Sequence, residues 1–154
     1  MNLQIFNTLS GKKEDFIPQN ANHVGMYVCG VTVYDYCHVG HARAAIVFDT
    51  LYRYFQHLDY KVRFIRNFTD IDDKIINRAN EEGIDWQEVN RKYIEAFYED
   101  MGKLNIASPT EEPKATDHIP EMLDMIQSLV DQDKAYESDG DVFYSIKSFK
   151  DYGC

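Results

Sequence analysis

The sequence contains few cysteines and prolines, and it has no long apolar run. Its 154 residues include three cysteines and four prolines. An odd number of cysteines without regular spacing excludes the disulfide framework of a small secreted protein and favours a reducing compartment. No stretch approaches 18 consecutive apolar residues, and the first eleven residues lack the pattern of a signal peptide. These absences predict a cytoplasmic chain without a membrane segment.

Basic charge is also scarce. The chain has 16 lysines and arginines against 26 acidic residues, for a formal net charge of −10. The deficit is uneven, because residues 1–67 carry a net charge of +2 and residues 68–154 a net charge of −12. Proteins that bind nucleic acid usually present a basic face, so this composition argues against a main RNA- or DNA-binding platform. A mildly basic first half can still bind a small anion.

The first half has the pattern of a βαβ unit. Residues 23–30 alternate apolar with small residues and end in glycine, which predicts a buried strand. Residues 39–58 have apolar residues at helical spacing, and residues 61–66 form a second short strand. Strand, helix and strand in this order predict an α/β fold with two parallel strands and a right-handed crossover. A chain of this size buries enough surface for a core without disulfides or metals.

The second half is predicted to be mainly helical and acidic. Residues 67–70 offer N-caps for a helix that Gly83 would end. Asp85 with Glu88 resembles the capping box of a second helix, and Asp117 is predicted to cap a third. We expect the carboxylates near the first of these helices to cap and hydrogen-bond rather than bind a metal. These carboxylates are Asp70, Asp72 and Asp73.

The pattern of the last residues is typical of the beginning of a further structural element. Asp139-Gly140 stands between two strand-like pieces and predicts a hairpin. Two parallel strands are also fewer than such a sheet normally has, so a truncated chain is expected. A free strand edge would then promote self-association.

The loop that joins the first strand to the helix, GVTVYDYCHVGH, carries the candidate chemistry. Ligands of open parallel sheets bind beyond the carboxyl ends of the strands, where this loop lies. His38 and His41 fall in the first helical turn, where unpaired N–H groups and the helix dipole favour an anion. Gly40 lets a phosphate or a base approach the backbone. The pattern is typical of a nucleoside triphosphate site, and it also fits a histidine pair that caps the helix or binds a metal.

Two longer blocks make a more specific comparison possible. MYVCGVTVYDYCHVGHAR at residues 26–43 and RNFTDIDDKI at residues 66–75 resemble the N-terminal part of the cysteinyl-tRNA synthetases, which are class I aminoacyl-tRNA synthetases. Residues 38–41 correspond to the class I signature His-Ile-Gly-His, with valine in place of isoleucine. The similarity runs from IFNTLSGKKEDF through GDVFYSI. It implies the first half of a Rossmann-like catalytic domain over residues 1–114 and the truncated start of a connective insertion over residues 115–154.

The resemblance also implies a reaction. The family condenses L-cysteine with ATP to give cysteinyl-adenylate and pyrophosphate, and then transfers the cysteinyl group to the 3′ end of tRNA(Cys). In this scheme His38 and His41 are catalytic, because they contact the ATP phosphates and stabilise the transition state. The resemblance adds Thr32 and Gly40 to the ATP site, and Cys29 and Thr69 to the cysteine site.

A zinc ion is a further implication of the resemblance, with Cys29 as its first ligand. A soft thiolate on zinc distinguishes cysteine from serine better than a pocket could by size. The family's other ligands lie in later segments that this chain lacks, so the chain alone is expected to be inactive. Adding Cys37, His38 and His41 to Cys29 would make a local zinc site, but would remove the phosphate contacts.

Two other functions stay open at this point. A related ligase that passes adenylate-activated cysteine to an amino-sugar acceptor would share the fold and the Cys29 site. A noncatalytic module would keep only weak nucleotide affinity at the histidine turn. The full-length members of the family are expected to be monomers without a membrane partner.

Overall fold

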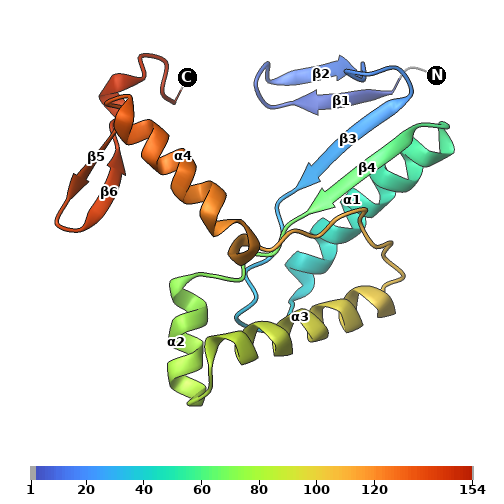
Figure 1. Ribbon diagram of the computed structural model, residues 1–154. Helices are drawn as coiled ribbons and strands as arrows, with labels where there is room; N and C mark the ends of the chain where they lie inside the picture. Colours follow the sequence, from blue (N-terminus) through green and yellow to red (C-terminus); the bar gives the residue numbers. More distant parts are fainter. Residues whose placement is uncertain (1–2, 154) are drawn as a thin grey trace. The chain divides into compact units, whose positions relative to one another are not determined.

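The computed structural model describes residues 3–153, which form two compact units that divide between Pro113 and Lys114 (Figure 1). The first unit contains β1 (Gln4–Asn7), β2 (Lys12–Asp15), β3 (His23–Val28), α1 (Val39–His57), β4 (Lys61–Arg66), α2 (Asp73–Glu82) and α3 (Trp86–Lys103). The second contains the 3-10 helix η1 (Ala115–His118), α4 (Ile119–Asp131), β5 (Ala135–Ser138), β6 (Asp141–Tyr144) and the 3-10 helix η2 (Ile146–Ser148). None of the helices within residues 3–153 is long and apolar enough to cross a membrane.

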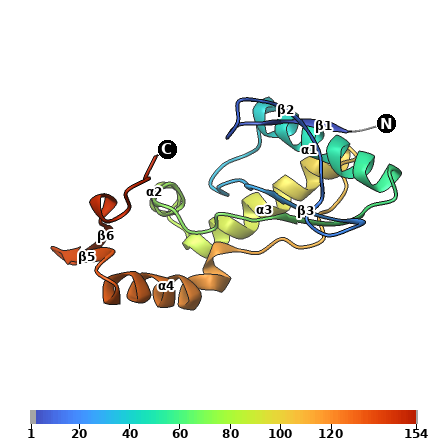
Figure 2. The ribbon, with the colours of Figure 1, turned by 90° about the horizontal axis from the view of Figure 1, so that it is seen from above.

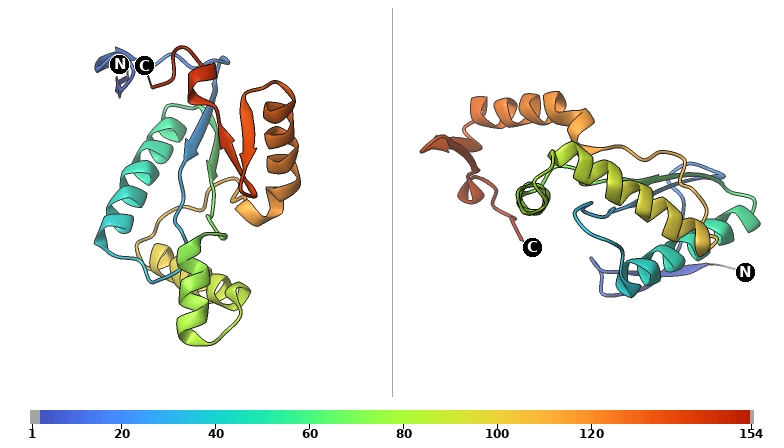
Figure 3. Two further views of the ribbon diagram at one scale, coloured as in Figure 1. Left: turned by 90° about the vertical axis from the view of Figure 1, so that its left-hand side faces the viewer. Right: turned by 90° about the horizontal axis from the view of Figure 1, so that it is seen from below.

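The predicted βαβ unit is confirmed. β3 and β4 run parallel, with His23 beside Lys61 and Val28 beside Arg66 (Figure 1). The connecting helix α1 runs alongside this strand pair (Figure 2; Figure 3). Phe55 anchors the helix with 2% of its surface exposed. The carboxyl ends of both strands therefore point to the loop that opens α1.

The other edge of β3 has no strand partner within residues 3–153. β4 is covered on its far side by the segment around Glu111, which bridges to Ile65. An unpaired strand edge is a template for pairing with another chain. Self-association through this edge stays a prediction.

The start of α2 confirms the capping role expected of Asp72 but differs from the prediction for residues 67–70. Asp72 is the N-cap, and its side chain accepts the backbone N–H of Lys74 at 2.9 Å. Residues 67–70, which were expected to cap the helix, instead continue the extended path of β4, and Thr69 bridges to Thr32. The predicted helix end is confirmed, since Gly83 adopts the left-handed conformation with φ of 66°.

The core of the first unit lies between α2, α3 and the loop that follows β3. Asp85 caps α3 as expected, whereas Glu88 pairs with Arg91 rather than closing a capping box. Trp86 packs against this core. The buried core residues are Val33, Phe68, Ile75, Ala79, Val89, Tyr93, Phe97 and Met101.

The second unit contains the predicted hairpin. Asp139 and Gly140 both have positive φ, 53° and 87°, and connect β5 to β6. The prediction that Asp117 caps the preceding helix is wrong, because Asp117 lies inside η1. α4 starts without a side-chain cap at His118 and has Pro120 in its first turn. Proline has no N–H, so one fewer donor needs a partner at this helix start.

Candidate active site

The first turn of α1 presents two neighbouring imidazole rings. The ring centroids of His38 and His41 are 4.0 Å apart. His38 Nδ1 accepts the backbone N–H of Gly40 at 3.0 Å, and His41 Nδ1 accepts the backbone N–H of His38 at 3.2 Å. These accepting roles place the proton of each neutral ring on Nε2. The pair caps the helix and still has two N–H donors for an anion at the helix N-terminus.

Gly40 is required by this packing. A Cβ at this position would lie 2.7 Å from Cε1 and 2.9 Å from Nδ1 of His38. A larger residue would push the His38 ring away and break the cap that the ring makes. The glycine therefore keeps the ring in place as well as exposing the backbone.

The histidine pair gives the fold a pH dependence. Burial, and then the neighbouring His38, lowers the pKa of His41 below its ordinary value of 6.5. The unfolded chain therefore takes up this proton at a higher pH than the folded chain does. We expect the unfolding free energy to fall as the pH drops below 6.5 and through the lowered folded pKa.

Urea denaturation at several pH values between about 7.5 and about 5 measures this effect. His41→Gln should remove part of the slope, whereas His57→Gln, at the far end of the same helix, should retain it. Equal slopes for the wild type and His41→Gln would contradict the assignment.

The two strand ends meet next to this turn. The backbone N–H of Gly30 donates to Asn67 Oδ1 at 2.8 Å. Thr32 and Thr69 are paired in a parallel bridge, and Thr69 N–H donates to the carbonyl of Val31 at 3.0 Å. The structure thus brings together the two threonines that were predicted to contact the substrates.

A small pocket of about 130 Å³ lies at the same end of the strands. Cys29, His41 and Arg66 line it together with apolar side chains from β3, α1 and α3. Cys29 is exposed, whereas Cys37 is half-buried against the core. Burial, and then the charge of Asp100, raises the pKa of the Cys37 thiol. Of the two cysteines within residues 3–153, Cys29 is therefore the more accessible to a ligand.

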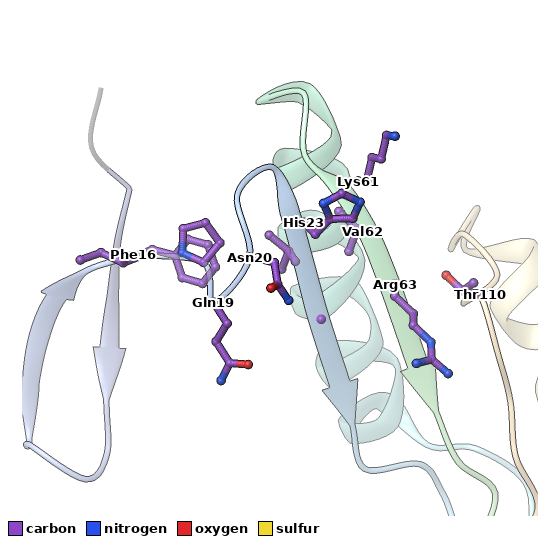
Figure 4. A pocket seen from close by; sticks show the side chains of 12 residues that line it. Phe16, Gln19, Asn20, His23, Lys61, Val62, Arg63 and Thr110 are labelled. Carbon is purple, nitrogen blue, oxygen red and sulfur yellow. The ribbon is translucent and has the colours of Figure 1, made fainter.

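A larger cavity of about 630 Å³ lies at the opposite, amino ends of β3 and β4 (Figure 4). Its lining includes His23, Lys61 and Arg63. Arg63 is occupied by a bidentate ion pair with Glu111, and Lys61 points away from the neighbouring side chains in the picture. The volume of this cavity alone would favour it as the ligand site. The polar side chains of Cys29, His41 and Arg66, however, line the smaller pocket at the carboxyl ends of the strands.

The described residues by themselves do not form a zinc site. Within residues 3–153, no group of three or more His, Cys, Asp or Glu side chains is placed to hold a metal ion. The side chains of Cys29, Cys37, His38 and His41 are not gathered into such a group in this structure, and both Nδ1 atoms of the histidines accept hydrogen bonds. Cys29 could supply one of the four ligands that zinc requires.

Three residues of this region escaped the sequence analysis. The sequence predicts Arg66 only as the end of a strand and Asn67 only as part of a cap, and it predicts no role in the site for Glu112. Arg66 lies two residues after buried Phe64, on the same face of β4. A charged residue at an inward position of a strand is the signal that could have revealed its role.

Comparison with known proteins identifies similar chains. The model of the tRNA synthetases class I (C) catalytic domain matches residues 15–154. A cysteine–tRNA ligase of Pelobacter propionicus is 57% identical over 152 residues, and one of Desulfotalea psychrophila is 58% identical over 153 residues. Both alignments cover 99% of this chain but only 31% of the relative. The chain therefore spans about a third of the length of these relatives.

Solved structures show the same fold at low identity. A methionyl-tRNA synthetase of Mycobacterium tuberculosis in complex with methionyl-adenylate superposes with a TM-score of 0.61 at 20% identity. The match covers 78% of this chain and 28% of that one. A putative arginyl-tRNA synthetase of Campylobacter jejuni has a TM-score of 0.53 at 17% identity. Both confirm the Rossmann-like α/β architecture.

Proposed function

Because the chain belongs to the family of class I (C) tRNA synthetase catalytic domains, we propose that it forms the part of a cysteine–tRNA ligase that binds ATP and cysteine. The observation that carries this proposal is that two pairs of residues lie beyond the carboxyl ends of β3 and β4. One is the pair His38 and His41, and the other is the bridged pair Thr32 and Thr69. The identity of about 57% to cysteine–tRNA ligases supports cysteine as the amino acid.

In the proposed reaction, the carboxylate of cysteine attacks the α-phosphate of ATP. The new C–O–P linkage forms as the bond to pyrophosphate breaks, and negative charge develops on the phosphate oxygens. The Nε2–H groups of His38 and His41, at the positive end of the α1 helix dipole, would hold these oxygens. Gly40 allows the nucleotide to lie against the backbone, while Thr32 and Thr69 orient the two substrates.

Cys29 has a separate role in the proposal. Its exposed thiol at the pocket rim would give one thiolate ligand to a zinc ion that recognises the substrate sulfur. The other ligands would come from residues beyond those described. Zinc would supply the preference for a thiol over a hydroxyl.

Binding of ATP to the 154-residue chain tests the proposal. Titration calorimetry should show binding of ATP and of a nonhydrolysable cysteinyl-adenylate analogue. His38→Ala and His41→Ala should each weaken ATP binding about tenfold to hundredfold, because each variant removes a hydrogen bond to a charged phosphate. His57→Ala is the matched control on the same helix and should bind like the wild type.

Two outcomes would count against the proposal. Absence of ATP binding by the wild type would remove its basis, and unchanged binding by both histidine variants would place the nucleotide elsewhere. Binding of ATP but not of the cysteinyl-adenylate analogue would favour the noncatalytic nucleotide-binding module.

The proposed activity also implies partners. L-cysteine, ATP and tRNA(Cys) would be the substrates of the full-length enzyme, which would act in the cytoplasm as a monomer. Aminoacylation by the 154-residue chain alone is expected to be negligible, because the chain spans only about a third of the length of its cysteine–tRNA ligase relatives. The similarity to tRNA ligases supports tRNA rather than an amino sugar as the acceptor.

A further inference from the structure

A buried guanidinium forms part of the wall of the small pocket at the candidate site. Arg66 is the last residue of β4, and its side chain is 8% exposed. Its Nε and Nη2 donate to Oε1 of Glu112 at 3.2 and 2.5 Å. Its Cζ lies 4.8 Å from the ring centroid of Phe97. The positive charge is therefore held by a carboxylate and by an aromatic face.

The second oxygen of the Glu112 carboxylate is also occupied. The hydroxyl of Tyr98 donates to Oε2 at 2.9 Å. Burial, and then this hydrogen bond, raises the pKa of Tyr98 to about 12, so the hydroxyl remains a donor at neutral pH. Arginine, carboxylate and phenol form one connected network beside the pocket.

A second ion pair joins the same two segments and provides a comparison. Arg63 and Glu111 also form a bidentate pair, at 2.8 and 2.9 Å, but their side chains are 64% and 48% exposed. Backbone bonds from Thr110 to Phe64 and from Arg66 to Glu111 already hold this segment along β4. The buried pair is not needed for the register, and a buried ion pair adds little net stability over apolar residues of similar volume.

Unlike the exposed pair, the buried pair of Arg66 and Glu112 lies next to residues that hold the strand ends. Asn67, directly after Arg66, accepts the N–H of Gly30 through its side chain at 2.8 Å. Phe68 N–H donates to the carbonyl of Pro113, directly after Glu112, at 2.9 Å. In both chain segments, the residue that follows the Arg66–Glu112 pair therefore takes part in a hydrogen bond near the end of β4.

From this placement we propose that Arg66 and Glu112 are positioning residues, whose ion pair holds Gly30 and Thr69 in the geometry that the substrates require. This inference rests on the proposed function, which supplies the substrates that Gly30 and Thr69 would serve. A site needs its contacting groups to be held by a supporting shell of packed and hydrogen-bonded residues. The pair supplies side-chain contacts of that shell beside the backbone hydrogen bonds from Phe68 to Pro113 and from Thr69 to Val31.

Amide hydrogen exchange of the 154-residue chain tests the positioning role without a ligand. In Glu112→Gln, exchange at the Gly30 and Thr69 amides should accelerate about tenfold, because their surroundings open locally. Amides of the β3–β4 ladder should change by less than about twofold. Glu111→Gln breaks the exposed pair one residue away and should leave both amides unchanged.

Two results would overturn the positioning role. One is unchanged exchange at both amides, and the other is equal acceleration throughout the first unit, which would make the pair merely structural. If Glu112→Gln does not fold, Tyr98→Phe removes a single hydrogen bond from the network. It should accelerate the same two amides about threefold, and no local change in this milder variant would equally reject the proposal.

A binding measurement separates this inference from the proposed function. In Glu112→Gln, or in Tyr98→Phe if that variant is used, the affinity for the cysteinyl-adenylate analogue should fall more than the affinity for ATP. We expect about a tenfold loss for the analogue and less than twofold for ATP in Glu112→Gln. A wild-type chain that binds neither ligand would reject the proposed function while the exchange result stands. Local acceleration without any loss of affinity would reject the link between the pair and the site.

Discussion

Gly30→Ala is expected to destabilise the first unit by about 3 kcal/mol, at the upper end of the effects of overpacking. A Cβ on Gly30 would overlap the carbonyl oxygen of Asn67 and lie 2.6 Å from its carbonyl carbon. Both are backbone atoms, so no side-chain rotation relieves the overlap. The two strand ends would have to separate, and the hydrogen bond from Gly30 to Asn67 would be lost.

Urea denaturation followed by the fluorescence of Trp86, which packs against the core of the first unit, measures this loss. Gly25→Ala is the matched control, because it lies on the same strand and a Cβ there meets nothing within 4 Å. A midpoint for Gly30→Ala equal to that of Gly25→Ala would show that the strand ends are not in contact.

Phe68→Ala is expected to have the largest effect on the core, about 3 to 5 kcal/mol. The ring is 1% exposed, and its centroid lies 5.4 Å from that of Phe97 and 5.7 Å from that of Tyr98. Alanine would leave a cavity between β4 and α3 and remove both edge-to-face contacts. Because domains of this size are stable by only about 5 to 15 kcal/mol, this loss would be a large fraction of the unfolding free energy.

The same fluorescence measurement applies, with Phe6→Ala as the control. Phe6 is 57% exposed on β1, so its loss should change the unfolding free energy by less than about 0.5 kcal/mol. Comparable losses for both variants would mean that Phe68 is not part of the cooperative core.

Local patterns predicted much of the fold. The bounds of β4 and the left-handed end of α2 at Gly83 agree with the sequence. So do the turn at Asp139 and Gly140 and the parallel pairing of β3 with β4. The strand bounds, the helix end and the turn depend on neighbouring residues, since period, glycine and turn chemistry act over a few positions. The parallel pairing follows from the strand–helix–strand order.

The errors arose where a distant segment competes with a local signal. Residues 67–70 include side chains that commonly cap helices. Their backbone instead pairs with the loop after β3 through the bridge between Thr32 and Thr69. The prediction for Asp117 failed for a different reason, because a short 3-10 helix with proline behind it replaces the expected cap. The hairpin of β1 and β2 was not predicted, since its four-residue strands carry too short a pattern.

The sequence by itself determined the family, the class of fold and the histidine turn, because long motif blocks and local periodicity carry that information. Only the tertiary structure decided which groups meet there. The buried pair of Arg66 and Glu112 joins residues 46 apart, and Gly30 meets Asn67 across 37 residues. Contacts at such separations depend on how β4 packs between the loop after β3 and the segment after α3. No local pattern records that packing, and it decides how the candidate site is held.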